Sequence, residues 1–157
     1  MSTTTVTHHL DAPIDEVFAA VGDPATVARL SPELQRVTFL DGAAGPAAGV
    51  RYRGINRNGP FVWSTVSTIT TFDPPHAVAH EVGFLGRTFS RWRYELTAAD
   101  GGTTVTASTD DLRPGWFARV SVLGTGVTDR PARNRDNLAA TLQALAEQLQ
   151  GRGSGSA

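Results

Sequence analysis

His80 is the side chain in this sequence best suited to acid–base chemistry. It alternates with Val78 and Val82 in an extended segment, so a strand would direct all three side chains to one face. An imidazole among apolar neighbours can act as a general base or acid near neutral pH. Tyr94 is a second candidate for proton transfer. The alternative for His80 is a structural histidine hydrogen-bonded in the core, which is the commoner role for such a residue.

Aromatic and amide side chains of the same region could bind a ligand. Trp92 and Tyr94 share a strand face and could stack on an aromatic compound, as Trp63 could from a facing strand. Asn56 and Asn134 could orient a ligand carbonyl, although such amides more often satisfy nearby backbone groups. The predicted ligand-binding residues are Tyr52, Asn56, Trp63, Thr65, Trp92 and Asn134.

Several chemistries are excluded by residue type or spacing. The chain has no Cys, and all 14 of its basic residues are Arg, so thiol nucleophiles, Cys-based zinc sites and lysine Schiff bases are absent. Adjacent strand residues point to opposite faces, so neither His8-His9 nor Asp110-Asp111 forms a converging pair. We therefore expect no bound metal and no cofactor. We also expect one of the two aspartates to form a salt bridge with Arg113.

The elements that must position these residues are mostly strands. Thr-rich and aromatic-rich segments alternate with short Gly/Pro turns, and this meander-like spacing indicates that each strand pairs with the next. Two short helices, near 12–21 and 24–30, follow the first strand. The predicted strands are 3–10, 35–40, 50–56, 62–72, 77–82, 88–97 and 103–112.

A long amphipathic helix is predicted at the C-terminus. Its apolar stripe consists of Leu138, Leu142, Leu145 and Leu149. Extrapolated backward, the stripe passes Asn134 toward Val127, Leu123 and Val120, with a bend or break at 124–126 and Pro131. The fold class is therefore α+β, a curved antiparallel sheet of about seven strands closed by this helix. Such a sheet leaves an internal apolar cavity beside the helix.

Length and charge fit a single domain. The 157 residues, 40% of them hydrophobic, predict one domain over 1–150 with a flexible tail at 151–157. A net charge of −1 and a pI of about 6.4 disfavour nucleic acid as a partner. No window approaches the roughly 18 apolar residues of a membrane span. We expect a cytoplasmic protein without integral membrane association, and a homodimer is left open.

Short motifs spread over residues 3–150 point to a known family. They are Tyr52-x-Gly54-x-Asn56-Arg57-x-Gly59-Pro60, Trp63, Asp73-Pro74-Pro75, Arg91-Trp92-Arg93-Tyr94-Glu95 and Gly101-Gly102-Thr103-x-Val105-Thr106. Together they resemble the SRPBCC or START-like superfamily, in its polyketide cyclase/dehydrase branch. The resemblance implies the helix-grip fold. One departure is Ala107, where related sequences often carry a Glu that could serve as an acid or polar anchor.

Two functions remain in consideration. Most acidic residues fall in turns, caps or outward positions, so we expect no carboxylate in the cavity, which disfavours two-carboxylate hydrolysis. A cyclase can still gain rate by folding a reactive poly-carbonyl chain in a shaped cavity. We therefore predict a cofactor-independent cyclase or dehydratase that binds an apolar or aromatic, polyketide-like small molecule. The alternative is a non-catalytic carrier of a lipid or another hydrophobic metabolite.

Overall fold

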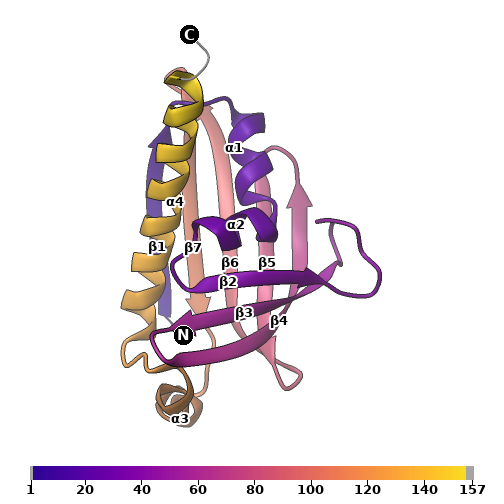
Figure 1. The fold of residues 1–157 in the computed structure, drawn as a ribbon, viewed down its shortest axis with the longest axis vertical. Coiled ribbons are helices and arrows are strands. Elements are labelled where there is room, and N and C mark those ends of the chain that lie inside the picture. Colours follow the sequence, from indigo (N-terminus) through magenta and orange to yellow (C-terminus); the bar gives the residue numbers. More distant parts are fainter. Residues whose placement is uncertain (1, 155–157) are drawn as a thin grey trace.

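One antiparallel sheet of seven strands forms the body of the protein (Figure 1). The computed structural model describes residues 2–154, with side chains through Gly151. The strand order is β1-β7-β6-β5-β4-β3-β2. The strands are β1 (Ser2–Leu10), β2 (Leu34–Phe39), β3 (Arg51–Asn58), β4 (Phe61–Asp73), β5 (Ala77–Phe84), β6 (Arg87–Ala99) and β7 (Gly102–Asp111). The meander from β2 to β7 confirms the predicted pairing for these six strands, whereas β1 pairs with β7 and not with β2.

Two short helices carry the chain from β1 at one sheet edge to β2 at the other. They are α1 (Ile14–Val21) and α2 (Pro24–Leu30). α2 begins after Asp23, whose carboxylate accepts a hydrogen bond from the backbone N–H of Ala25 at 3.0 Å. This cap satisfies one of the free N–H groups of the first turn, and Pro24 needs no partner there.

The C-terminal region forms two helices, α3 (Gly115–Thr125) and α4 (Arg130–Ser154). Gly126, with φ of 68°, ends α3 in the left-handed conformation, and Pro131 occupies the first turn of α4, so the predicted break is confirmed. α4 continues through Gly151 to Ser154, where we expected a tail. The remainder of that predicted tail, residues 155–157, lies outside the described residues. No helix of the described chain combines the length and apolarity needed to span a bilayer.

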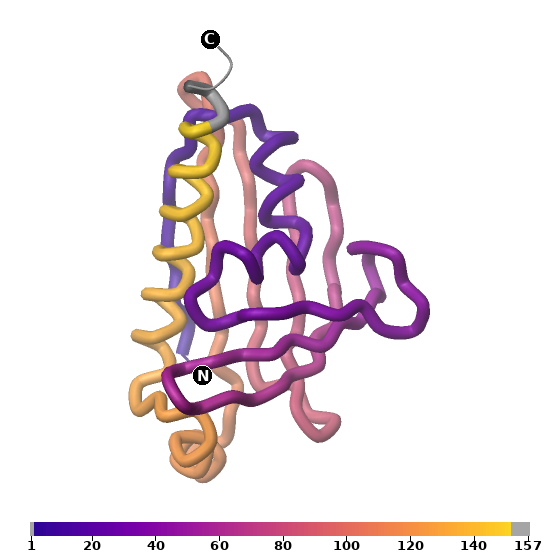
Figure 2. Tube along the Cα trace, viewed as in Figure 1, coloured from indigo at the N-terminus to yellow at the C-terminus, as the bar shows by residue number. Residues whose placement is uncertain are grey.

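Bulges bend the sheet around α4. The register of the β4–β5 pair shifts between Ile69 and Thr71 in β4, and that of the β5–β6 pair shifts at Phe89 in β6, which has no register partner in β5. A bulge increases local twist and bends its strand. Figure 2 shows the result: β3 and the start of β4 cross the view, whereas β5, β6 and β7 run along its long axis.

The core lies between the concave face of the sheet and α4. The four leucines predicted as the α4 stripe are buried, as are Val78, Leu96 and Val105 on the inward face of the sheet. The backward extrapolation of that stripe holds for Val127, which is 7% exposed, but is wrong for Val120 and Leu123 on α3, which are 54% and 81% exposed. α3 is a separate helix with no buried residue, although Phe117 stacks on Phe89 of β6 with 4.3 Å between the ring centroids.

Candidate functional site

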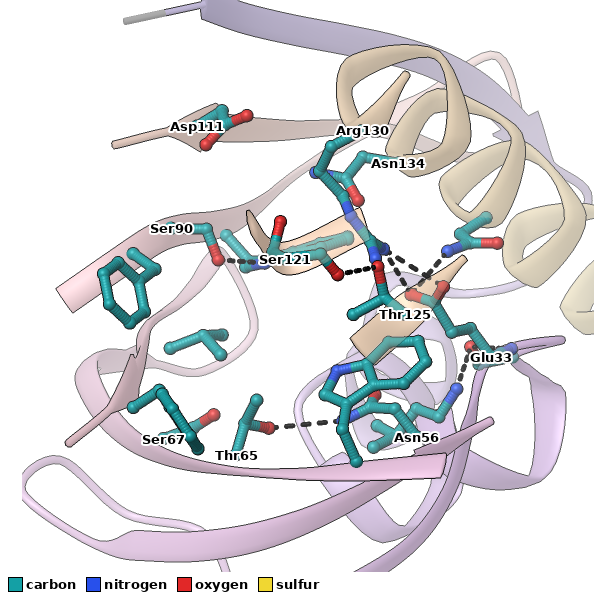
Figure 3. Close-up of a pocket in the computed structure, with 18 of the residues that line it drawn as sticks. Glu33, Asn56, Thr65, Ser67, Ser90, Asp111, Ser121, Thr125, Arg130 and Asn134 are labelled. Carbon is teal, nitrogen blue, oxygen red and sulfur yellow. Dashed lines mark hydrogen bonds and ion pairs between the residues drawn. The ribbon is translucent and has the colours of Figure 1, made fainter. Parts of the chain in front are cut away.

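A cavity of about 610 Å³ lies between the sheet, α4 and α3. Its volume suits a small organic ligand, and its wall is mostly apolar with a few polar groups. Figure 3 shows side chains from the sheet and from α4 converging on it. All eight residues singled out in the sequence line it: Tyr52, Asn56, Trp63, Thr65, His80, Trp92, Tyr94 and Asn134.

Four neighbouring strands contribute a buried polar cluster, the inner polar group, made of Tyr52, Ser67, His80 and Tyr94. The rings of Tyr52 and His80 meet edge to face at 6.0 Å between centroids. Burial raises the pKa of Tyr52 to about 12, and a hydrogen bond with Ser67 opposes this shift. Burial, reinforced by Tyr52, also raises the pKa of Tyr94. Both phenols are therefore protonated near neutral pH and can donate hydrogen bonds to a ligand oxygen.

His80 is neutral in this environment. Burial lowers its pKa from 6.5 to about 4, because the charged imidazolium loses its hydration. Its Nδ1 is buried and has no hydrogen-bond partner among the described residues. A structural histidine would normally satisfy that atom, and leaving it unpaired costs about 1–3 kcal/mol. His80 therefore lacks, at Nδ1, the hydrogen bond expected of a structural histidine in the core.

The two tryptophans are held in place by polar neighbours. The Trp92 indole N–H donates to Ser90 Oγ at 3.0 Å. The guanidinium of Arg130 lies 5.6 Å from the centre of the Trp63 ring. Both indoles are fixed at the cavity wall, where a planar ligand could stack on them.

The side chains of the two asparagines do not hydrogen-bond to backbone groups of the described residues. Asn56 Nδ2 donates to Thr65 Oγ1 at 3.4 Å, across the β3–β4 pair. Asn134 is 3% exposed, and its side chain makes no hydrogen bond to another described residue. An amide so placed at a cavity wall is available to a ligand carbonyl or hydroxyl.

The expectation of a cavity without carboxylates is wrong. Glu33 lines the cavity and is 7% exposed. Its carboxylate accepts two hydrogen bonds from Arg130 Nη1, at 3.0 and 2.9 Å, and one from Asn137 Nδ2 at 3.1 Å (Figure 3). Arg133 Nε lies 3.7 Å from the same carboxylate. The pairing joins the start of β2 to α4 across 97 residues, and no local sequence pattern signals it.

A second acidic residue, Asp111, also lines the cavity. It forms the predicted salt bridge, with Arg113 Nη2 at 2.7 Å from its Oδ2. Burial alone would raise the pKa of Asp111, but the hydrogen bonds and charge of Arg113 outweigh it and lower that pKa. Both cavity carboxylates are therefore ion-paired, which does not fit the free acid and base of a glycosidase. Within the described residues, no three His, Asp or Glu side chains gather as a metal site would require.

Solved structures with this fold are numerous. Protein Ms6760 from Mycobacterium smegmatis is 21% identical, with a TM-score of 0.65 over 96% of this chain and 92% of that one. The ginseng (Panax ginseng) major latex-like protein 151 is 15% identical, with a TM-score of 0.71 over 94% and 96%. These likenesses confirm the helix-grip fold.

A third structure comes from a biosynthetic pathway. The di-domain ARO/CYC protein BexL, of the BE-7585A pathway, is 25% identical, with a TM-score of 0.64 over 93% of this chain. This chain spans 49% of BexL. No curated protein matches the chain at a significant level.

The family assignment rests on the whole domain. The family model described as polyketide cyclase / dehydrase and lipid transport matches residues 1–149, which include every strand and nearly all of α4. The predicted resemblance is confirmed, and the chain is a member of the polyketide cyclase / dehydrase and lipid transport family.

Proposed function

We propose that this protein is a cofactor-independent cyclase or dehydratase that acts on an aromatic, polyketide-like substrate with several carbonyl groups. The observation that carries the proposal is the inner polar group at the wall of an otherwise apolar cavity. It offers one neutral imidazole and two protonated phenols. Membership of a family that includes cyclases and dehydrases supports it.

The cavity residues would have two roles: some would fix the conformation of the substrate, and others would transfer protons. Trp63 and Trp92 would hold the ligand in a folded conformation, which brings the reacting carbons together. His80 would accept a proton from a carbon beside one carbonyl of the folded chain, leaving an enolate. The enolate carbon would then attack a second carbonyl, and Tyr94 would donate its proton to the resulting alkoxide. The proton taken by His80 would then return to the Tyr94 phenolate, and loss of the new hydroxyl with a neighbouring hydrogen, as water, gives the dehydrated ring.

The opposite side of the cavity offers an anchor for a ligand oxygen. Arg130 bonds Glu33 through Nη1 alone, so its Nε and Nη2 make no hydrogen bond to the described residues. With the amide of Asn134, these donors suit a carbonyl or a carboxylate. A substrate with a polar end and an apolar body matches this arrangement.

A carrier without catalytic activity is the second candidate. The observation that favours it is the low pKa of His80, about 4, which makes the imidazole a weak proton acceptor. An apolar cavity and neutral polar groups are all that such a carrier needs.

Substitutions in the inner polar group separate the two functions. For a cyclase, we expect Tyr94→Phe and His80→Gln each to lower kcat about 100-fold or more, with the Kd changed by less than about threefold. A synthetic aryl triketone serves as substrate, and Ser64→Ala, at the cavity wall, is the matched control. If both variants change only the Kd, and the wild type shows no turnover, the protein is a carrier.

The pH profile of turnover gives an independent test of His80. A base is active when unprotonated, so kcat/KM should fall only below the His80 pKa of about 4 and stay level through 6.5. The measurement is kcat/KM for the same triketone from pH 8 to the acid limit of folding, followed by circular dichroism. An acid limb near 6.5 would exclude the buried His80 as the base.

A further inference from the structure

Exposed apolar side chains gather at one end of the molecule. In the part of the chain that the structure describes, every large hydrophobic side chain that is exposed lies on the β3–β4 turn, the β5–β6 turn or α3. We call this set the apolar rim: Val62, Phe84, Leu85, Trp116, Val120 and Leu123. A patch with this composition marks an interaction surface.

The three segments of the apolar rim contact one another. Phe84 of the β5–β6 turn lies 6.5 Å from Phe117 of α3, measured between ring centroids. At the other end of α3, Asn58 Nδ2 donates to the carbonyl oxygen of Thr125 at 2.8 Å. Figure 1 shows α3 and the two turns together at the lower end of the protein. The rim is therefore one surface rather than three separate features.

The apolar rim surrounds the mouth of the cavity. Phe84, Val120 and Leu123 line the cavity, yet they are 42%, 54% and 81% exposed. Side chains that belong both to a cavity wall and to the outer surface mark its opening. A ligand that enters or leaves here crosses an apolar edge.

All charged side chains in the segments that carry the apolar rim are positive. Residues 57–62, 84–87 and 115–125 contain Arg57, Arg87 and Arg119 and no acidic residue, although the whole chain has a net charge of −1. The next acidic residue after α3, Asp129, is engaged at the start of α4, where it accepts from the backbone N–H of Ala132 at 3.0 Å. Arg87 and Arg119 have no ion-pair partner within residues 2–151.

We propose that the apolar rim binds the surface of a membrane that contains anionic lipids, with the cavity mouth facing the acyl chains. Apolar side chains flanked by arginines are the composition that inserts into the boundary between headgroups and acyl chains. At this surface an apolar ligand passes between bilayer and cavity without crossing water. The proposal holds for a cyclase and for a carrier alike.

The shape and charge of the rim favour a membrane over a protein partner. Leu85 is 86% exposed and, like Trp116 and Leu123, protrudes from its own segment. A bilayer accepts such separate protrusions, whereas a folded partner must offer a matching pocket for each. A second copy of the chain would bring three arginines against three others, and like charges across an interface are unfavourable.

Vesicle binding tests the proposal with the full-length protein. We expect cosedimentation with phosphatidylcholine vesicles that contain about one third phosphatidylglycerol, and less binding in high salt or to phosphatidylcholine alone. The triple variant Leu85→Ser, Trp116→Ser and Leu123→Ser should weaken partitioning about tenfold or more. The double variant Arg87→Glu and Arg119→Glu should weaken binding to the anionic vesicles only.

Controls distinguish the rim from general effects. Arg36 and Arg53 are exposed and lie away from the rim segments, so Arg36→Glu with Arg53→Glu makes the same charge change and should retain binding. All variants should keep the wild-type thermal midpoint. Absence of binding to anionic vesicles, or equal binding by the triple variant, overturns the proposal. So does a homodimer in sedimentation equilibrium that the triple variant dissociates, because the rim would then bind a second copy.

Discussion

Replacement of Glu33 by alanine should destabilise the protein by about 3–5 kcal/mol, the usual cost of removing one partner from a buried ion pair. The substitution leaves Arg130, whose side chain is 12% exposed, without its carboxylate, and it removes the acceptor of Asn137. Burial already lowers the pKa of Arg130, so its charge depends on this compensation. Urea unfolding followed by circular dichroism measures the change in free energy.

An exposed ion pair provides the matched control for Glu33. Asp41 accepts two hydrogen bonds from Arg51, at 2.9 and 3.1 Å, but both side chains are in solvent. Asp41→Ala should therefore leave the unfolding midpoint almost unchanged. Equal midpoints for Glu33→Ala and Asp41→Ala would show that the Glu33 cluster does not hold α4 to the sheet. Glu33→Gln, which keeps the side-chain volume, should have an unfolding midpoint between those of Glu33→Ala and Asp41→Ala.

Replacement of Val82 by tryptophan should close the cavity and weaken ligand binding at least about tenfold. Val82 lines the cavity, and its neighbours in the strand register, Ser67 and Ser90, are small. The added indole therefore has space in the cavity and little reason to disturb the core. Titration with the fluorescent apolar probe 1-anilinonaphthalene measures the Kd.

The opposite face of the same strand provides a control for Val82. Ala79 lies between Thr71 and Arg93 and is not part of the cavity wall. Ala79→Trp should bind the probe as the wild type does. If Val82→Trp also binds normally, while remaining folded, the probe does not occupy this cavity.

Strand alternation was sufficient to predict which sheet residues face the cavity. The side-chain period of a strand is two, so placing Val78 inward also places His80 inward, and Leu96 likewise fixes Tyr94. These assignments depend only on neighbours within the strand. The alternation of β3 through β7 in the structure agrees with them.

The ion pairs and the apolar rim could not be predicted in the same way. Glu33 follows a Ser-Pro pair at the end of α2, and its partner Arg130 lies 97 residues further along the chain, so their meeting depends on how α2 and the segment after it pack against α4. For Val120 and Leu123, helical spacing indicates an apolar face but not what covers it. The break at Gly126 separates α3 from α4, and the face that carries Val120 and Leu123 is left in solvent.

Native mass spectrometry of the purified protein, followed by denaturing extraction, identifies the compound in the cavity and so distinguishes a cyclase from a carrier. We expect one molecule per chain of a compound with several carbonyl groups or fused rings, or one added aryl triketone if the protein is purified empty. A fatty acid or a mixture of lipids in that place would contradict the cyclase and indicate a carrier. A protein that binds neither its own metabolite nor the triketone would contradict ligand binding in this cavity.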